Sequence, residues 1–412
     1  MVLHVMNSAA GGAALSTVDL IRGFADHGIL SCVVCDDRGG AAERQLILDA
    51  VDGRATFFPL HWMNRKTRAK WWKRPILALL SWQRTGATLI STRRVVEFAR
   101  THNADLIHTN TIVTPEGGCA AVRLGLPHVW HLRELVGRGA HIQFWREGKR
   151  LGDYWRRHCS IIVANSEVTA SHVRSWVPSE FLQVVPNGID LSHFSAAPRL
   201  RKQNDQIVVA MVGNLGSKSK KHKLFVQSAA CVDRKLPIEW RLYGHGPLLV
   251  GKKHADPYVA EIVAELDCTG LAPKFAFMGF EPDPAKIMSE IDILVHPTEL
   301  ESFGRVFAEA MASQVAVAAV RGGGAAELIV DNETGLLSEP NNPAALGANI
   351  SRLAQDPSLR RRLGSAGRQR VETHYSLDVS VQRLLNVYRF AMQHPVVRGR
   401  PDAPFSYSMR VT

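Results

Sequence analysis

Short apolar runs alternate with helical stretches along the chain, and this alternation limits the possible folds more than any other feature. Val2–Met6 is an apolar run, a small glycine-containing loop follows at 7–12, and another apolar run covers 29–35. Between the runs, apolar residues recur at every third position: Leu15, Val18, Ile21 and Phe24. This spacing predicts a helix between two strands. Strands joined through helices lie parallel in one sheet with helices on both faces, so the sequence predicts an α/β fold.

The alternation comes in two series. The first continues with predicted strands at 105–108, 128–131 and 160–164, and it stops near 194–205, where polar and basic residues predict a linker. The second starts at Ile207–Val212 and continues with predicted strands at 238–243, 275–278, 291–296 and 315–320. The predicted organisation is two doubly wound Rossmann-like domains, 1–195 and 207–375, a linker at 196–206, and a C-terminal helix and tail at 376–412. Ligands bind at the carboxyl ends of strands in such folds, so we expect the domains to face each other across a binding cleft.

The composition narrows the classes of partner and compartment. The chain has 412 residues and a formal net charge of +12, which favours an acidic partner such as nucleic acid, anionic lipid or a phosphorylated ligand. No nucleic-acid-binding motif accompanies the charge, so nucleic acid is not expected. The sequence starts without a signal-peptide pattern and has no apolar run of about 18 residues, which predicts a cytoplasmic protein. Six dispersed cysteines fit a reducing compartment, and Cys32 and Cys35 are expected to face opposite sides of one core strand.

The stretch HPTELESFGRVFAE, which ends at Glu309, holds a pair of glutamates beside a predicted helix start. Glu301 lies in a short loop, and a helix is predicted from near Ser302, with Glu309 about two turns inside it. The free N–H groups of Phe303 and Gly304 would then form an anion site that the helix dipole supports. Two carboxylates placed in this way can hold hydroxyl groups on either side of a bound diphosphate. The alternative is an ordinary capped helix with one exposed glutamate.

This stretch is one of several motifs that together resemble glycosyltransferase family 4. The others are VPNGID at 185–190 with Phe194, GHGP at 244–247, FMG at 277–279, GGG at 322–324 with Glu327, and NETGLL at 332–337. In their order and spacing they extend over nearly the whole chain. The resemblance implies a GT-B fold with a C-terminal helix that crosses back to the first domain, retention of the anomeric configuration, and no need for a metal ion or other cofactor. The sequence contains no Asp-x-Asp, the metal–diphosphate motif of the other large glycosyltransferase fold, which fits the last implication.

The resemblance also implies roles for matching residues. Glu309 would hold the ribose of the nucleotide, and Glu301 would hold hydroxyls of the donor sugar near C3. Phe303 and Gly304 would offer backbone N–H groups to the sugar or the phosphate. The remaining matches are Lys220 with the phosphate-binding lysine, Gly11 and Gly12 with the glycine loop that closes over the donor, and His131 with the active-site histidine near donor and acceptor. The catalytic candidates are therefore Lys220, Glu301 and His131.

The sequence departs from the family pattern at the phosphate site. The family has Gly-Arg six residues before the lysine, whereas here Gly213 is followed by Asn214. An asparagine can still bind phosphate, but without charge its hydrogen bond is about half as strong. Lys218, Lys221 or Arg133 would then have to supply the missing charge. Lys221, which stands where the family has glycine, is a milder departure.

The chemistry requires a diphosphate to leave with its charge stabilised. Without a metal, Lys220, the helix N-terminus at Phe303 and the first-domain glycines are the candidates, and they would act electrostatically in a closed cleft. The family implies front-face attack by the acceptor, whose proton passes to the leaving phosphate. For His131 the alternative is a structural role, common for a lone histidine after an apolar strand. His108 and His296 also end predicted strands, and we assign them to structural support.

The interval between Asp52 and Glu97 has no acidic residue but contains ten Lys or Arg and four of the nine tryptophans. Basic residues and paired tryptophans beside an apolar run at 76–80 suit a membrane interface with anionic lipid. The same composition would suit a phosphorylated or polyprenyl-linked acceptor, or a basic helix packed on the first domain. We expect the segment 65–82 to face the acceptor or the inner face of a membrane, and to have little to do with the donor.

These features predict a retaining glycosyltransferase that moves a hexosyl unit from a nucleotide-diphosphate sugar to a glycan or lipid-linked acceptor, in polysaccharide or glycolipid synthesis. A nucleotide-sugar 2-epimerase would share the fold without needing an acceptor, but the PNGID and ESFG blocks argue against it. A non-catalytic nucleotide-sugar-binding protein is the third hypothesis, and Asn214 is its only support. Turnover of the donor with and without an acceptor distinguishes the three.

Overall fold

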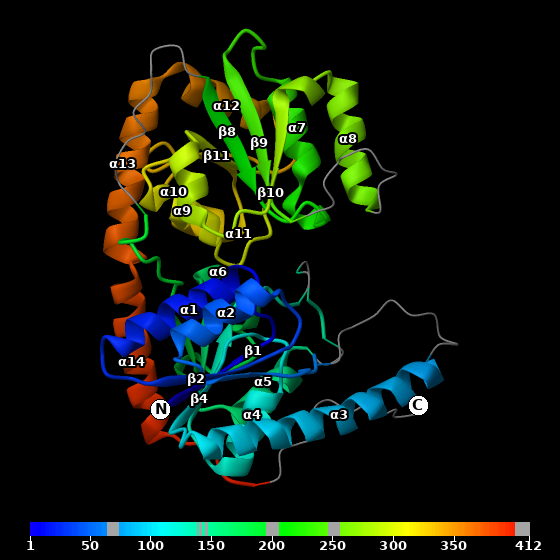
Figure 1. Ribbon diagram of the computed structural model, residues 1–412, viewed down its shortest axis with the longest axis vertical. Coiled ribbons are helices and arrows are strands. Elements are labelled where there is room, and N and C mark those ends of the chain that lie inside the picture. The colour runs from blue at the N-terminus through cyan, green and yellow to red at the C-terminus, as the bar shows by residue number, and fades with distance from the viewer. Residues whose placement is uncertain are drawn as a thin grey trace. The chain divides into compact units, whose positions relative to one another are not determined.

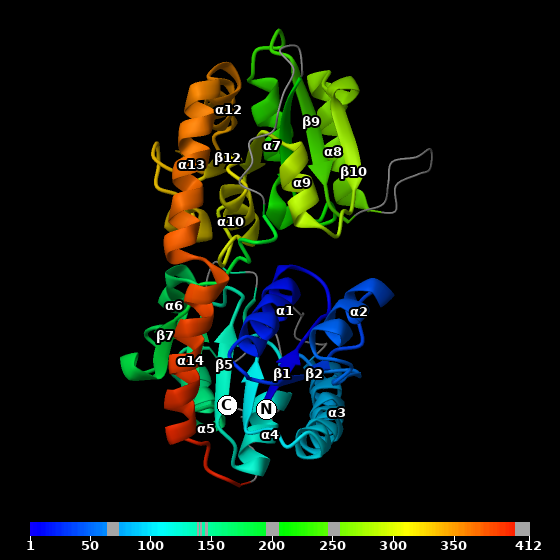
Figure 2. The ribbon, with the colours of Figure 1, turned by 60° about the vertical axis from the view of Figure 1, so that its left-hand side comes forward.

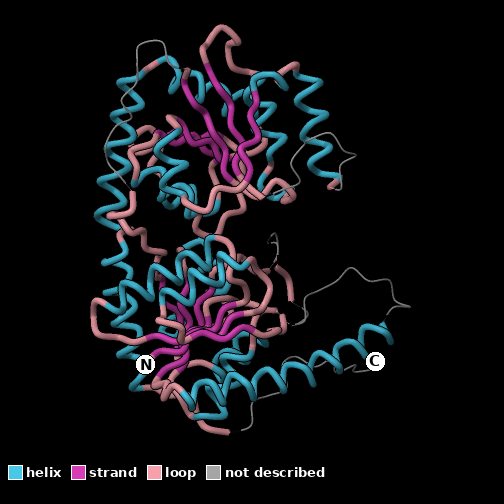
Figure 3. Tube along the Cα trace, in the orientation of Figure 1, coloured by secondary structure: helices cyan, strands magenta, loops and turns pink. Residues whose placement is uncertain are grey.

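The computed structural model describes residues 1–63, 74–137, 140, 142–144, 147–194, 206–245 and 256–399, and for 74–85 it describes the helical backbone alone. The chain divides into two compact units. One consists of Met1–Gly188 together with Leu377–Thr412, and the other of Ile189–Ser376. Each unit is a parallel sheet with helices on both faces, as the alternation of strands and helices predicts (Figures 1 and 3).

The first unit contains a seven-stranded parallel sheet in the order β3-β2-β1-β4-β5-β6-β7. Its strands are β1 (Val2–Met6), β2 (Ser31–Cys35), β3 (Ala55–Phe57), β4 (Leu106–Thr109), β5 (His128–Leu132), β6 (Ile161–Ala164) and β7 (Leu182–Val184). The strand order reverses at β1, which pairs with both β2 and β4. Doubly wound sheets bind ligands at such a reversal, beyond the carboxyl ends of the strands.

Helices cover both faces of this sheet. They are α1 (Gly12–Ala25), α2 (Ala41–Ala50), α3 (Arg74–Thr101), α4 (Glu116–Leu124), α5 (Lys149–His158), α6 (Glu167–Val173) and α14 (Leu377–Gln393). Residues of α3 and α4 pack with Cys32 in one buried cluster, whereas residues of α1 and α2 pack with Cys35 in another. Both cysteines are buried and free. Because they pack in different clusters, the prediction that they face opposite sides of one core strand is confirmed.

The C-terminal helix α14 belongs to the first unit although it follows the second in sequence. Its buried residues Leu384, Val387 and Ala391 pack with Val2 and Phe24. Figure 2 shows α14 beside α1 and β5, which it contacts. The prediction that the C-terminal helix crosses back to the first domain is therefore confirmed.

The second unit contains a six-stranded parallel sheet in the order β10-β9-β8-β11-β12-β13. Its strands are β8 (Ile207–Val212), β9 (Ile238–Tyr243), β10 (Phe275–Gly279), β11 (Ile293–His296), β12 (Ala316–Val320) and β13 (Leu336–Ser338). Its helices are α7 (His222–Ala230), α8 (Pro257–Thr269), α9 (Pro284–Glu290), α10 (Arg305–Ala312), α11 (Gly323–Leu328), α12 (Pro343–Gln355) and α13 (Pro357–His374). Here the order reverses at β8, between β9 and β11.

Several predictions fall partly or wholly outside the described residues. They concern the linker 196–206 except for Gln206, the part of the segment 65–82 that precedes α3, the second half of the GHGP turn, and the tail from residue 400. The contacts of side chains 74–82 lie outside the description as well. Within the part of the chain that the structure describes, no helix is long and apolar enough to cross a membrane.

Candidate active site

Glu301 lies at the centre of an ionic cluster beyond the carboxyl ends of β8 and β11. The Lys220 ammonium contacts Oε1 of Glu301, and Nε2 of His296 lies 3.1 Å from the same oxygen. The Lys220 and Glu301 side chains are 29% and 16% exposed, and His296 is fully buried. Burial lowers the pKa of His296, so the neutral ring donates from Nε2 to the carboxylate. Two catalytic candidates and a histidine assigned to support are thus brought together.

Glu301 is ionised throughout the physiological range. Burial alone would raise the pKa of its carboxyl, but the charge of Lys220 and the hydrogen bond from His296 outweigh it and lower the pKa to about 2. An ionised carboxylate can only accept hydrogen bonds, which suits it to bind sugar hydroxyls.

The low pKa of Glu301 predicts a stability that depends on pH. The folded pKa lies below the unfolded value, so the stabilisation is complete above pH 5 and is lost as the pH falls toward 2. Between pH 5 and pH 3 the loss amounts to about 2 kcal/mol. In urea unfolding, the difference in unfolding free energy between the wild type and Glu301→Gln should shrink by that amount over this interval. A difference that stays constant would show that the pKa of the Glu301 carboxyl is not lowered in the folded protein.

The helix that follows Glu301 begins later than the sequence predicts. It was expected from near Ser302, but α10 begins at Arg305. Phe303 is 2% exposed and packs in the core against Tyr375, and Gly304 caps the helix with φ +81°. Only glycine adopts this backbone conformation without cost, so the helix cannot start before it. Within the described ranges, the N–H groups of Phe303 and Gly304 donate to no other group of the protein, which leaves them available to a ligand.

Glu309 consequently lies just over one turn inside α10, not two. Its Oε1 accepts a hydrogen bond of 2.6 Å from Nε of Arg305, one turn before it. Both side chains are nearly buried, with 8% and 11% exposed for Glu309 and Arg305 respectively. The ordinary capped helix with an exposed glutamate, which the sequence left open, does not describe this residue.

Three consecutive glycines, 322–324, pack closely against the loop that carries Glu301. The N–H of Gly324 donates to the Glu301 carbonyl over 2.8 Å. A Cβ on Gly323 would lie 2.4 Å from that carbonyl oxygen, and one on Gly324 would lie 1.9 Å from the carbonyl oxygen of Phe303. No side chain fits at these distances, so the glycine block of the sequence motif positions the loop that carries Glu301 and Phe303.

Asn214 and the three possible substitutes for the family arginine all have other partners. Oδ1 of Asn214 accepts the N–H of Gly216 over 3.0 Å and so closes a tight turn. Lys218 pairs with Glu261 at 2.7 Å, Lys221 contacts Glu299, and Arg133 donates to Asn187 and Asn110. Lys220 packs its aliphatic stem on Gly213, where a Cβ would lie 3.3 Å from Cγ of the lysine.

Lys221 adopts a left-handed backbone conformation, with φ +56°, which favours the glycine that the family has there. Its ammonium lies 2.6 Å from Oε1 of Glu299 and 2.9 Å from Oδ1 of Asn341. Lys221→Gly and Lys221→Ala both remove these contacts, but only glycine also removes the backbone strain. We expect the glycine variant to be about 1 kcal/mol more stable than the alanine variant in urea unfolding. Equal stabilities would mean that the position is unstrained.

In the first unit, the buried His131 is the end of a chain of hydrogen bonds that includes His108 and Tyr388. Its Nδ1 lies 3.2 Å from Nε2 of His108, and Nδ1 of His108 lies 2.7 Å from the Tyr388 hydroxyl. Burial, and then the charge of Arg133, lowers the pKa of His131 well below its usual value. Burial also lowers the pKa of His108, so both rings are neutral. Tyr388, from α14, carried no signal in the sequence, because its contact with His108 spans 280 residues.

The glycine loop of the first unit follows β1. Gly11 has φ +89° and Gly12 begins α1, and both residues are exposed. A Cβ on Gly11 would meet nothing within 4 Å, so the left-handed conformation and not crowding explains the glycine. The loop lies at the carboxyl end of β1, where the strand order reverses. Its position is the one expected of a loop that approaches a ligand.

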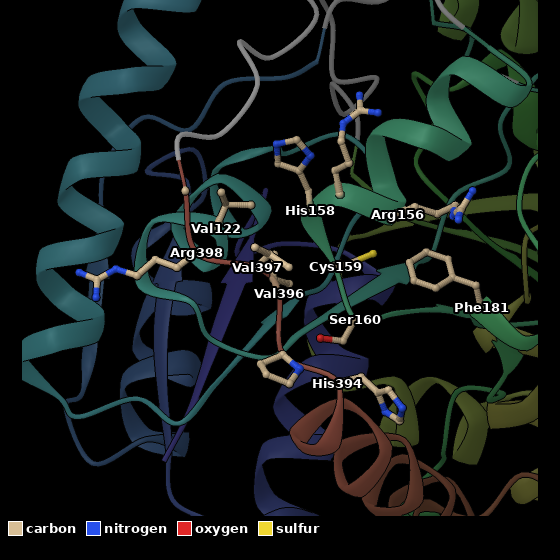
Figure 4. A pocket seen from close by; sticks show the side chains of 13 residues that line it. Val122, Arg156, His158, Cys159, Ser160, Phe181, His394, Val396, Val397 and Arg398 are labelled. Carbon is tan, nitrogen blue, oxygen red and sulfur yellow. The ribbon is translucent and has the colours of Figure 1, made fainter.

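Two cavities in the first unit are lined by residues other than His131 and those of the glycine loop. One, with a volume of about 480 Å³, is lined by Arg156, Arg157, Phe181 and the segment 394–399, among others (Figure 4). Another, of about 600 Å³, is lined by His27, Tyr388 and other residues. Neither contains a residue predicted for the site. Among the described residues, no three His, Cys, Asp or Glu side chains are grouped so that they could hold a metal ion.

Two family models match the chain, one after the other. The model for Glycosyltransferase Family 4 matches residues 10–193, and the model for Glycosyl transferases group 1 matches residues 195–370. Between them they cover most of the chain, and their boundary lies next to the predicted linker.

Curated relatives show the same similarity. The chain is 27% identical over 187 residues to the capsular polysaccharide biosynthesis glycosyltransferase CapM of Staphylococcus aureus, covering 45% of this chain and 46% of the relative. It is 24% identical over 306 residues to the MMP alpha-(1->4)-mannosyltransferase of Mycolicibacterium hassiacum, covering 70% and 71%. The chain spans about half the length of the first curated relatives that it matches.

Solved structures show the likeness of fold. Anabaena Alr3699/HepE in complex with UDP and glucose has a TM-score of 0.74 at 23% identity, covering 94% of this chain and 99% of that chain. The sucrose-phosphate synthase from Thermosynechococcus elongatus has a TM-score of 0.69 at 18% identity, covering 94% and 98%.

Proposed function

Because the chain belongs to the family-4 type of GT-B glycosyltransferases, we propose that it transfers a hexosyl unit from a nucleotide-diphosphate sugar to a glycan or lipid-linked acceptor, with retention of configuration. The observation that carries the proposal is the cluster of Lys220, Glu301 and His296 beside the N–H groups of Phe303 and Gly304, which donate to no described residue. A cation, an ionised carboxylate and open backbone donors together match a phosphate joined to a polyhydroxyl group.

Each residue has a defined part in this mechanism. Lys220 stabilises the charge that develops on the diphosphate as its bond to the sugar C1 breaks. Glu301 accepts hydrogen bonds from donor-sugar hydroxyls, and Glu309 accepts them from the ribose. The acceptor oxygen forms its bond to C1 on the face that the diphosphate leaves, and its proton passes to a phosphate oxygen. No protein carboxylate then has to act as the base.

The acceptor is proposed to be a growing polysaccharide or a glycolipid. The name of the relative CapM supports the polysaccharide, and the segment 65–82 is proposed to approach an acidic acceptor or an anionic membrane surface because of its charge. The described residues of the donor site do not include this segment. The proposed donor site and the proposed acceptor or membrane contact can therefore be tested separately.

The test is thermal unfolding of the full chain with a panel of UDP, GDP, UDP-glucose, UDP-galactose, UDP-N-acetylglucosamine and GDP-mannose. A ligand present at a hundred times its Kd stabilises the folded state by about 2.7 kcal/mol. We expect one nucleotide sugar and its free nucleotide to raise the melting temperature. If none does, the proposed function is wrong.

Turnover of the selected donor then decides between the hypotheses. We expect slow hydrolysis of the donor by water and faster transfer in the presence of an oligosaccharide or lipid-linked acceptor, with the anomeric configuration of the product, read by NMR, equal to that of the donor. An epimerised sugar formed without an acceptor would indicate a 2-epimerase. Tight binding without turnover would indicate a binding protein.

Metal removal should leave the activity unchanged. Lys220 and the backbone N–H groups are proposed to carry the charge stabilisation that a divalent cation supplies in other sites. We expect transfer rates to be equal, within error, before and after dialysis against EDTA. Restoration of a lost rate by Mg²⁺ or Mn²⁺ would contradict this mechanism but not the fold.

A further inference from the structure

A chain of hydrogen bonds connects the C-terminal helix to His131. It runs from the hydroxyl of Tyr388 on α14 to His108 on β4 over 2.7 Å, and from His108 to His131 on β5 over 3.2 Å. All three side chains are buried, and the two histidine rings are nearly coplanar, with an interplanar angle of 8° and ring centroids 5.3 Å apart. Within the described residues, Nε2 of His131 has no hydrogen-bond partner although it is buried. Native proteins rarely leave such an atom unpaired, so a water molecule or a ligand is expected to bond to it.

The positions of the protons follow from the partners. Among the described residues the Tyr388 hydroxyl has a single hydrogen-bond partner, Nδ1 of His108, so we assign the hydroxyl proton to that hydrogen bond. A neutral imidazole carries one proton, so Nε2 of His108 must then carry it and donate to Nδ1 of His131. By the same rule, the single proton of His131 lies on Nε2.

The neighbouring side chains of His4 and Arg133 do not change these proton positions. His4, whose ring centroid lies 5.3 Å from that of His108, is bound to Asn110 and Ser31 on its two nitrogens. Burial lowers the pKa of His4 to about 3, so it adds no charge. The guanidinium of Arg133 is held by Asn187 and Asn110, and its charge opposes protonation of His131.

We propose that Tyr388 and His108 are positioning residues that fix His131 as an Nε2–H donor, aimed at an oxygen of the bound sugar or phosphate. This inference rests on the proposed function and makes it more specific. In this tautomer His131 has no lone pair to offer on Nε2, so it cannot take the proton of the acceptor hydroxyl. His131 instead donates a hydrogen bond that orients an oxygen. The C-terminal helix thereby fixes the tautomer of a site residue 257 positions away (388 minus 131).

The test reads the tautomer directly and needs no ligand. Long-range ¹H–¹⁵N spectra of the full chain labelled with ¹⁵N-histidine distinguish a protonated from a bare ring nitrogen, and His131→Gln identifies the His131 signals. We expect wild-type His131 to be protonated on Nε2 alone. In Tyr388→Phe no hydroxyl donates a hydrogen bond to Nδ1 of His108, so the tautomer of His108 is no longer fixed. His131 should then be a mixture of both tautomers.

The matched control is Tyr154→Phe, which removes another buried tyrosine hydroxyl of the same unit, one close to Cys119. This variant should keep the wild-type tautomer, and melting temperatures check that both variants are folded. A wild-type His131 protonated on Nδ1, or a tautomer unchanged in folded Tyr388→Phe, overturns the proposal. If Tyr388→Phe does not fold, a wild-type His131 protonated on Nδ1 still overturns the proposal. Failure of every nucleotide sugar to bind would instead reject the proposed function and leave this result standing.

Discussion

Lys220→Met should reduce sugar transfer about a hundredfold to a thousandfold, the effect typical of removing one group that stabilises transition-state charge. Methionine keeps the length of the side chain and its packing on Gly213 but removes the ammonium that contacts Glu301. Most of the loss should appear in kcat, because the diphosphate is more negative in the transition state than in the bound donor. The measurement is steady-state transfer with the donor that the panel selects.

Lys223→Met is the matched control for this substitution. Lys223 lies three residues further along the same segment, is 38% exposed, and faces Glu265 at 3.5 Å. Its loss should leave the rate within about twofold of the wild type, because exposed ion pairs contribute little. If both variants lose activity equally, Lys220 has no special role. If Lys220→Met affects only KM, it binds the donor without stabilising the leaving group.

Glu309→Ala should weaken binding of the free nucleotide about a hundredfold. A hydrogen bond to a charged group contributes about 1.5–3 kcal/mol, and two ribose hydroxyls would lose their acceptor together. The expectation rests on the position of the carboxylate, which is nearly buried, held by Arg305 at 2.6 Å, and one turn inside α10. Isothermal titration with the nucleotide measures the change, and circular dichroism checks that the fold is intact.

A second arginine–glutamate pair in the same unit gives the control. Arg368 and Glu372 on α13 are also four residues apart, also at 2.6 Å, but Glu372 is 49% exposed. Glu372→Ala should leave nucleotide affinity unchanged. A variant Glu309→Ala that binds the nucleotide as the wild type does would exclude Glu309 from the ribose site.

The sequence predicted the class of the fold and most of its longer strands. The predicted strands Val2–Met6, Ile207–Val212 and Ile238–Tyr243 match β1, β8 and β9 residue for residue, because apolar runs between helical stretches are a local property. It did not predict β3, β7 and β13, which have three residues each and are too short to show a period. The motif residues that make up the candidate site were likewise visible in the sequence, through their resemblance to a family.

Which of these residues lie in contact depends on the tertiary structure. Lys220 and Glu301 are 81 positions apart, and Tyr388 and His108 are 280 apart, so no local pattern brings them together. Their contacts depend on the strand order and on the packing of α14. The start of α10 was mispredicted for a related reason. Because Phe303 is buried and Gly304 has a left-handed conformation, α10 begins only at Arg305. The burial of a residue depends on neighbours that are distant in sequence.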